Sequence, residues 1–291
     1  MRRPAPKSLA EIRHPGPKAA DRRPFIPCAA EAVSFEIASD RPLLEALGHW
    51  AEAEGIDSAI LNLGGVALAP FDYVMPDRAI DDRHAAWYSD TRSCEKARLE
   101  EAVAVFGWRD GGWFAHIHAF WLEGGQKRLG HLLPDTLTLA TTSTLTGYGL
   151  KGARFEAAFD PETEFTLFRV KETVSRHSGL PINALIATLA PFEDIHQSVE
   201  SLAATLGTPA YEVMGLGSFA GASFHDTASM TGLISEILLR PGAGSPEGKG
   251  LSIPVRCVDL DGNYHQGTVL AGQAPTLVTC ELLIRSEDSS P

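Results

Sequence analysis

Apolar residues with the spacing of one helical face follow Pro42, a residue suited to the first turn of a helix. They are Leu43, Leu47, Trp50 and Ala51, and Gly55 ends the pattern. The strand-like segment FEIAS precedes this predicted helix, and the buried-strand pattern AILNLGG follows it and ends at a glycine pair. The pattern therefore predicts a strand, a helix and a second strand early in the chain.

The same order of elements returns about 152 residues later. The strand-like IATL is followed by a helical pattern that ends at Gly207 and by the strand pattern YEVMGLGSF. The apolar face of this second helix consists of Ile195, Val199, Leu202 and Ala203, each 152 positions after its counterpart in the first helix. We interpret this correspondence as an internal duplication of domain size.

The predicted fold class is α+β, with two domains that each pack a mostly antiparallel sheet against a helix. We place the domains at residues 25–175 and 180–287, with a link near Ser175 to Pro181. Residues 1–24 are rich in Pro, Ala, Lys and Arg and lack periodic apolar positions, which is typical of a flexible tail. A polar stretch at residues 72–93 has no counterpart in the second copy, and it is either a surface loop or a lid over a site.

Composition and charge narrow the possible functions. The chain has 291 residues, of which 44% are hydrophobic and 21% are charged, as in ordinary globular proteins. Residues 1–24 contain seven Lys or Arg and two acidic residues, a net charge of +5; because the whole chain carries −12, residues 25–291 carry −17. A body this acidic repels DNA, so DNA contacts are expected only from the basic tail.

No segment approaches the roughly 18 apolar residues of a membrane helix, and the N-terminus lacks the apolar region of a signal peptide. We therefore expect a cytoplasmic protein with no membrane partner. The four cysteines form no CxxC pair, so we expect reduced thiols rather than a disulfide scaffold or a zinc ribbon; they are Cys28, Cys94, Cys257 and Cys280.

The segment HIHAFWLEGGQKRLGHLLP carries His116, His118 and His131. If Gly124 and Gly125 form a two-residue turn, His118 lies opposite His131, and His116 points to the same sheet face. Opposed Cβ atoms are about 5 Å apart, so the three imidazoles converge. Three histidine nitrogens with an open fourth position are typical of catalytic zinc, although imidazole also suits iron, nickel or copper. Structural or surface histidines, or a metal-free polar site, are the alternatives.

The second copy lacks this histidine trio. Its hairpin contains Asp261-Gly262, and a two-residue turn there places Val255 opposite Thr268. The positions that match the three histidines are then Ile253, Val255 and Thr268. We therefore expect one metal per chain and a second copy that serves as a structural or pocket-completing partner. His265 is expected to face the other side of the sheet.

Candidate catalytic residues lie at the first hairpin and in the polar stretch. Near the turn, Glu123, Lys127 and Arg128 offer acid–base or charge-stabilising groups. The candidates that could reach over a metal from residues 72–93 are Asp72, Tyr73, Asp82, Arg83 and His84. For each of them a solvated surface side chain is the alternative. No GxSxG, HExxH, Walker loop or GxGxxG after a strand is present.

With these motifs the chain resembles the plant- and prokaryote-conserved (PPC) domain family over residues 33–170 and 183–285. The segment FEIASDRPLLEALGHWAEAEGIDSAILNLGGVA is similar to the family's opening strand, helix and strand. The His-rich hairpin is similar to one with a G-G-H-L signature, which here reads Leu129-Gly130-His131-Leu132 and, in the second half, Gln266-Gly267-Thr268-Val269. The first glycine is thus absent in the first half, and the second half departs at the histidine.

The resemblance implies α+β domains that assemble as trimers. It also implies a fold similar to that of acetolactate decarboxylase, an enzyme whose zinc is held by three histidines. Bacterial members of the family are often labelled DNA-binding by analogy with plant members that carry AT-hook motifs. The AT-hook core is missing here, since Arg2-Arg3-Pro4 and Arg22-Arg23-Pro24 match it only in part.

The leading hypothesis is a zinc-dependent lyase or hydrolase that acts on a small oxygenated acid or carbonyl compound at the three histidines of the first domain. The second hypothesis is a DNA-binding, transcription-associated protein that uses the basic tail. The third is a metal-binding scaffold without catalysis. Self-association, with a trimer favoured, is expected in each case.

Overall fold

The computed structural model describes residues 4–173, 179–247 and 249–287. Its two α-helices are α1 (Leu43–Glu54) and α2 (Ile195–Ala203). The strands of the first half are β1 (Phe25–Ile37), β2 (Ser58–Asn62), β3 (Ala67–Leu68), β4 (Phe71–Val74), β5 (Pro76–Asp77), β6 (Trp87–Tyr88), β7 (Arg92–Cys94), β8 (Ala97–Arg109), β9 (Gly112–Glu123), β10 (Gln126–Leu132), β11 (Ser143–Lys151), β12 (Ala153–Phe159) and β13 (Thr166–Glu172). Those of the second half are β14 (Ala184–Leu189), β15 (Tyr211–Phe219), β16 (Ser235–Leu239), β17 (Gly244–Ser245), β18 (Pro254–Asp259), β19 (Tyr264–Thr268) and β20 (Thr276–Ser286).

Both predicted helices are confirmed, together with the start of the first near Pro42 and the glycines at which the two helical patterns end. Pro42 precedes α1, and Gly55 ends it with a left-handed φ of 62°. The side chain of Asp194 caps α2 by accepting a hydrogen bond from the backbone N–H of Gln197 at 3.0 Å. A short 3₁₀ turn then extends α2 to Gly207, whose φ is 69°.

The two halves repeat one order of neighbouring strands. In the first half it is β1-β11-β2-β8-β9-β10, and in the second it is β14-β20-β15-β16-β18-β19. All of these neighbours are antiparallel, as the sequence predicts. Strand β1 joins the halves, because residues 25–28 pair with β14 and residues 29–37 pair with β11. The domain boundaries stay a prediction, and most of the predicted link near Ser175 to Pro181 lies outside the described residues.

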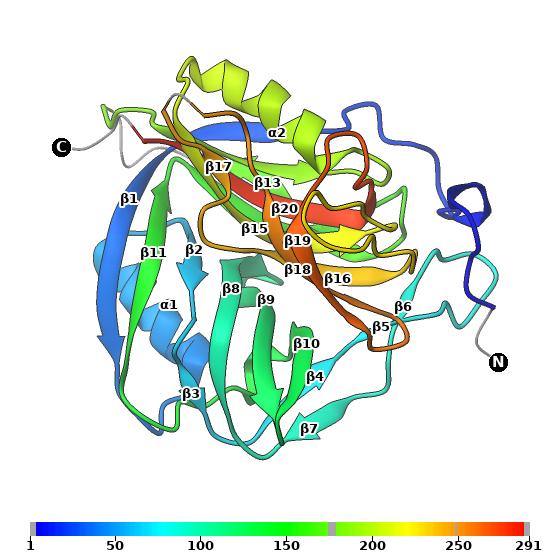
Figure 1. The fold of residues 1–291 in the computed structure, drawn as a ribbon. Helices are drawn as coiled ribbons and strands as arrows, with labels where there is room; N and C mark the ends of the chain where they lie inside the picture. The colour runs from blue at the N-terminus through cyan, green and yellow to red at the C-terminus, as the bar shows by residue number, and fades with distance from the viewer. Residues whose placement is uncertain (1–3, 174–178, 248, 288–291) are drawn as a thin grey trace.

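The prediction of an α+β fold is wrong. Strands make up 50% of the described residues and helices 11%, so the fold is largely all-β. The physical reason is that one face of each half's sheet packs against the other half rather than against a helix. An apolar cluster between the sheets unites Ile60 and Val105 of the first half with Leu216 and Leu283 of the second. The helices cover the outer faces, with α1 and α2 on opposite sides of the molecule (Figure 1).

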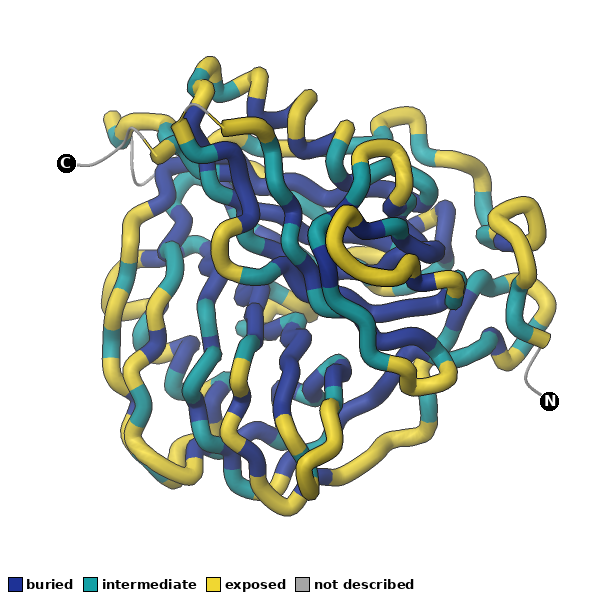
Figure 2. The backbone as a smooth tube through the Cα atoms, in the orientation of Figure 1, coloured by how far each residue is buried: buried dark blue, intermediate teal, exposed yellow. Residues whose placement is uncertain are grey.

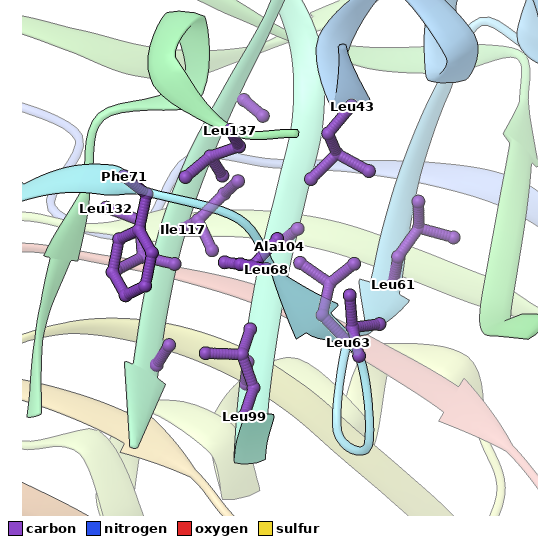
Figure 3. Packing of buried hydrophobic residues seen from close by; sticks show 14 of the residues in the cluster. Leu43, Leu61, Leu63, Leu68, Phe71, Leu99, Ala104, Ile117, Leu132 and Leu137 are labelled. Atoms are coloured by element: carbon purple, nitrogen blue, oxygen red, sulfur yellow. The ribbon is translucent and has the colours of Figure 1, made fainter. Parts of the chain in front are cut away.

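The alternation of β9 decides which of its side chains face the second half. Ile117 and Ala119 belong to the core beneath α1, part of which Figure 3 shows. By the two-residue period of a strand, His116 and His118 lie on the opposite face, toward the second half. The middle of β9 is buried, as are the strands of the second half that lie against it (Figure 2). The histidines therefore lie between the two sheets.

The N-terminal segment lies along the body from residue 4 onward. Arg22 pairs with Glu162 and Glu193, and Ile12 belongs to a buried apolar cluster with Ile234 and Leu277. Within the described parts of the chain, neither helix is long and apolar enough to cross a membrane.

Candidate metal centre

The first hairpin has the register that its glycine pair predicts. Gly124 and Gly125 have φ values of 57° and 79°, the conformation of a two-residue hairpin turn. Strand pairing then places His118 opposite His131. The ring centroid of His116 lies 4.7 Å from that of His118 and 4.8 Å from that of His131. The predicted convergence of the three imidazoles is confirmed.

Each imidazole uses one ring nitrogen for an outer contact. His116 Nδ1 lies 2.8 Å from a carboxylate oxygen of Glu281, and His118 Nδ1 lies 2.7 Å from the carbonyl oxygen of Ile237. His131 Nδ1 lies 3.3 Å from the hydroxyl of Tyr88. Such outer partners orient metal-binding histidines and fix which nitrogen carries the proton. They leave the three Nε2 atoms for the interior, where those of His116 and His118 are 3.0 Å apart.

A carboxylate of the second half completes the cluster. Glu236 of β16 and the three histidines each offer a ligand atom, and these atoms all lie within 4.8 Å of one another. Glu236 is buried and its Oε2 is in close contact with His118 Nε2, but no hydrogen bond satisfies that oxygen. Within the described residues this is the one group of three or more potential ligands.

The donor set fits a divalent transition metal. Two imidazole nitrogens face each other at 3.0 Å, beside a buried carboxylate oxygen that lacks a hydrogen bond. A buried cluster of imidazoles and a carboxylate is costly unless its charges and lone pairs are balanced, and one cation between the four ligand atoms would satisfy all of them. Imidazole and carboxylate are ligands for zinc, and they also suit other first-row metals.

The charges around the cluster separate the roles of its members. Burial lowers the pKa of His116, but the Glu281 carboxylate outweighs it, so the pKa is raised. Burial, together with the neighbouring His116 and His118, lowers the pKa of His131 well below its ordinary value. His131 is therefore held neutral, as a metal ligand must be. Burial of the Tyr88 hydroxyl, with Glu236 and Glu281 nearby, raises its pKa well above 10.

Sequence reasoning missed Glu236, Glu281 and Tyr88. The two glutamates lie inside otherwise apolar strand patterns, SEILL and TCELLI, and Glu281 is only 1% exposed. A single acidic residue in a buried strand was the available signal, because buried carboxylates are nearly always paired or bound to a cation. Tyr88 comes from the polar stretch at residues 72–93, and no signal in the sequence distinguishes it from its neighbours.

The second hairpin departs from its predicted register. Val255 pairs with Gly267, and Thr268 pairs with Pro254 instead. The cause is a three-residue loop closed by the pair Asp259 and Asn263, in which Gly262 has a φ of 80°. An Asp-Gly pair inside such a loop shifts the register by one residue relative to a two-residue turn.

The candidate catalytic residues lie away from the histidines. Arg128 Nε donates to Glu123 at 3.0 Å, and Lys127 Nζ lies 4.6 Å from the centroid of the Tyr264 ring. His84 Nδ1 lies 2.8 Å from a carboxylate oxygen of Asp81. None of the eight candidates is among the described residues that line the cavity beside the cluster, and their catalytic roles stay predictions.

That cavity has a volume of about 270 Å³ and is bordered by His116, His118 and Glu236. The polar stretch at residues 72–93 contributes part of its wall, namely Pro76, Ala86, Trp87 and Tyr88. Of the two interpretations of this stretch, its position agrees with a cover over the site rather than with a loop remote from it.

The sequence matches no protein-family profile and no curated protein. Solved structures to which it is similar include a metal-containing protein from Archaeoglobus fulgidus, at 18% identity and a TM-score of 0.39, covering 50% of this chain and 97% of that one. A "putative DNA-binding protein" from Ralstonia eutropha JMP134 has 19% identity and a TM-score of 0.38, covering 47% of this chain and 90% of that one. A plant- and prokaryote-conserved (PPC) protein from Pyrococcus horikoshii has 17% identity and a TM-score of 0.37, covering 50% of this chain and 96% of that one. Each similarity therefore spans about half of this chain.

Proposed function

We propose that the protein binds one divalent transition metal, zinc in the first place, through His116, His118 and His131 together with Glu236. The observation that carries this proposal is the convergence of four ligand atoms within 4.8 Å, one of them a buried carboxylate oxygen from the second half of the chain. The outer contacts of the three Nδ1 atoms support it, because they turn each Nε2 toward the same point.

We further propose that the site is catalytic and acts on a small oxygenated acid or carbonyl compound, as a lyase or hydrolase. A divalent metal supplies Lewis acidity toward a carbonyl or carboxylate oxygen. The cluster borders a cavity large enough for a small molecule, so a substrate can reach it. The Tyr88 hydroxyl, 3.3 Å from His131 Nδ1, holds His131 in orientation.

Turnover by the metal-loaded full chain tests this function. The protein is stripped with a chelator, reloaded with Zn²⁺ and incubated with small 2-oxo acids, 2-hydroxy acids and esters. We expect turnover that chelation and His118→Ala both abolish. Full metal occupancy without turnover of any of these three classes of compound would instead favour a non-catalytic metal-binding scaffold.

The repeated strand order supports a tandem duplication of a PPC-like unit, in which only the first copy keeps the histidines and the second contributes Glu236 and Glu281. The alternative function is a DNA-associated role through residues 1–24. The net charge of +5 on that segment supports this alternative. Two of the seven cations are already engaged, because Arg22 pairs with Glu162 and Arg23 pairs with Glu193.

A further inference from the structure

The cavity beside the histidines is assembled from six separate parts of the chain. Strand β9 supplies His116 and His118, residues 76–88 and 165–167 form two walls, and strands β15, β16 and β20 of the second half form the rest. At about 30 Å³ for each water, 270 Å³ corresponds to about nine waters. The space therefore suits a molecule of about ten non-hydrogen atoms.

The walls away from the cluster are apolar. Trp87 and Phe165 lie with ring centroids 5.5 Å apart, and Ile234, Leu277 and Val278 also contribute. The described residues that line the cavity include no Lys or Arg. A second charged group on a bound molecule would thus lack a partner, which is costly in such surroundings. The occupant is expected to have one polar end and an apolar body.

Among the described residues that line the cavity, one buried hydroxyl makes no hydrogen bond. Thr279 lines the cavity, is 5% exposed, and its Oγ1 makes no hydrogen bond. It lies two residues before Glu281 on β20, so the two side chains share the sheet face that contacts His116. The other buried hydroxyls of the cavity are engaged, since Ser235 Oγ donates to Phe219 at 2.9 Å and Ser218 Oγ accepts from Val278 at 3.0 Å.

We infer that this cavity binds a small monocarboxylic or 2-oxo acid with an aromatic or branched apolar body. The oxygen-bearing end lies at the metal cluster, where Thr279 Oγ1 donates a hydrogen bond to one of its oxygens. The apolar body lies against Trp87 and Phe165. This inference rests on the proposed metal site and specifies the substrate class of that site.

Calorimetric titration of the Co²⁺-loaded full chain with two acids tests the inference. Benzoylformate carries a phenyl ring on a 2-oxo acid, and pyruvate has the same polar end with only a methyl group. We expect benzoylformate to bind at least tenfold more tightly than pyruvate, because the ring buries apolar surface. Trp87→Ala should reduce this preference to less than threefold while leaving the affinity for pyruvate within about twofold.

The hydroxyl is tested with Thr279→Val, which keeps the shape of the side chain. We expect the affinity for both acids to fall about three- to tenfold, as for the loss of one hydrogen bond, and Thr279→Ser to restore it. The matched control is Ser198→Ala in α2, which removes another buried hydroxyl that makes no hydrogen bond but does not line the cavity. This control should leave both affinities unchanged.

The absorption spectrum of Co²⁺ in the same samples separates the two proposals. The absorption spectrum can show Co²⁺ bound by nitrogen and oxygen ligands while the two acids bind equally or not at all. In that case the inference is overturned and the metal site stands. If Trp87→Ala and Thr279→Val change nothing, the inference is overturned as well. If the protein binds no Co²⁺, both proposals are overturned.

Discussion

Glu101 of β8 connects the two halves through a pair of arginines, and its replacement by glutamine should destabilise the protein. Arg256 donates to both carboxylate oxygens, at 2.7 and 2.8 Å, and Arg240 does so at 2.9 and 3.0 Å. Burial raises the pKa of Glu101, but the two guanidinium groups outweigh it and lower the pKa from 4.5 to about 2. The glutamate side chain is 18% exposed, so solvent screens the cluster only in part.

The magnitude follows from that pKa. A fall from 4.5 to about 2 corresponds to about 3 kcal/mol at 1.36 kcal/mol for each pH unit. After allowance for partial exposure we expect Glu101→Gln to lower the free energy of unfolding by about 2 kcal/mol at pH 7. Because the pKa is depressed in the folded state, this contribution is complete above about pH 5 and is lost as the pH falls through 2. At pH 3 less than half of it should remain.

Urea denaturation of wild type and variant at pH 7 and pH 3 measures this difference. Glu100→Gln, an exposed neighbour on the same strand, is the control and should change the free energy of unfolding by less than about 0.5 kcal/mol. A difference below 0.5 kcal/mol for Glu101→Gln at pH 7, or one of equal size at both pH values, would refute the reasoning.

Three further predictions concern packing, DNA and assembly. Gly107→Ala should destabilise the protein by about 2 kcal/mol or more in thermal denaturation, because the new Cβ would lie 2.2 Å from the carbonyl oxygen of Phe155; Gly112→Ala, where the nearest atom is 3.9 Å away, should have little effect. A chain that starts at Phe25 should not bind duplex DNA at about 200 mM salt, whereas the full chain should bind weakly at about 50 mM; tight binding by the shorter chain would favour the DNA hypothesis. Light scattering at micromolar concentration should show an oligomer, with a trimer expected, and a monomer would contradict this.

The local parts of the site could be predicted from the sequence. The two-residue turn at Gly124 and Gly125 and the period of a strand are sufficient to bring His118 opposite His131, because both effects act within one hairpin. The helix ends at Gly55 and Gly207 are local in the same sense.

The remaining parts depend on long-range packing. Glu236 and Glu281 meet the histidines only because the two sheets pack face to face, and the alternation within one strand does not reveal what covers its second face. The same packing turns the expected α+β fold into a largely all-β one. The second hairpin was mispredicted because Asp261-Gly262 lies within a three-residue loop rather than forming a two-residue turn.

The metal content of the reloaded full chain tests the central claim most directly. After equilibration with Zn²⁺ and removal of excess metal, elemental analysis by mass spectrometry should show one zinc ion per chain. His131→Ala and Glu236→Gln should each weaken zinc binding at least tenfold. His265→Ala, which removes a histidine whose Nε2 lies 3.1 Å from Asp259 in the second half, should keep one zinc. Two zinc ions per chain, or full occupancy with undiminished affinity in both His131→Ala and Glu236→Gln, would contradict the account.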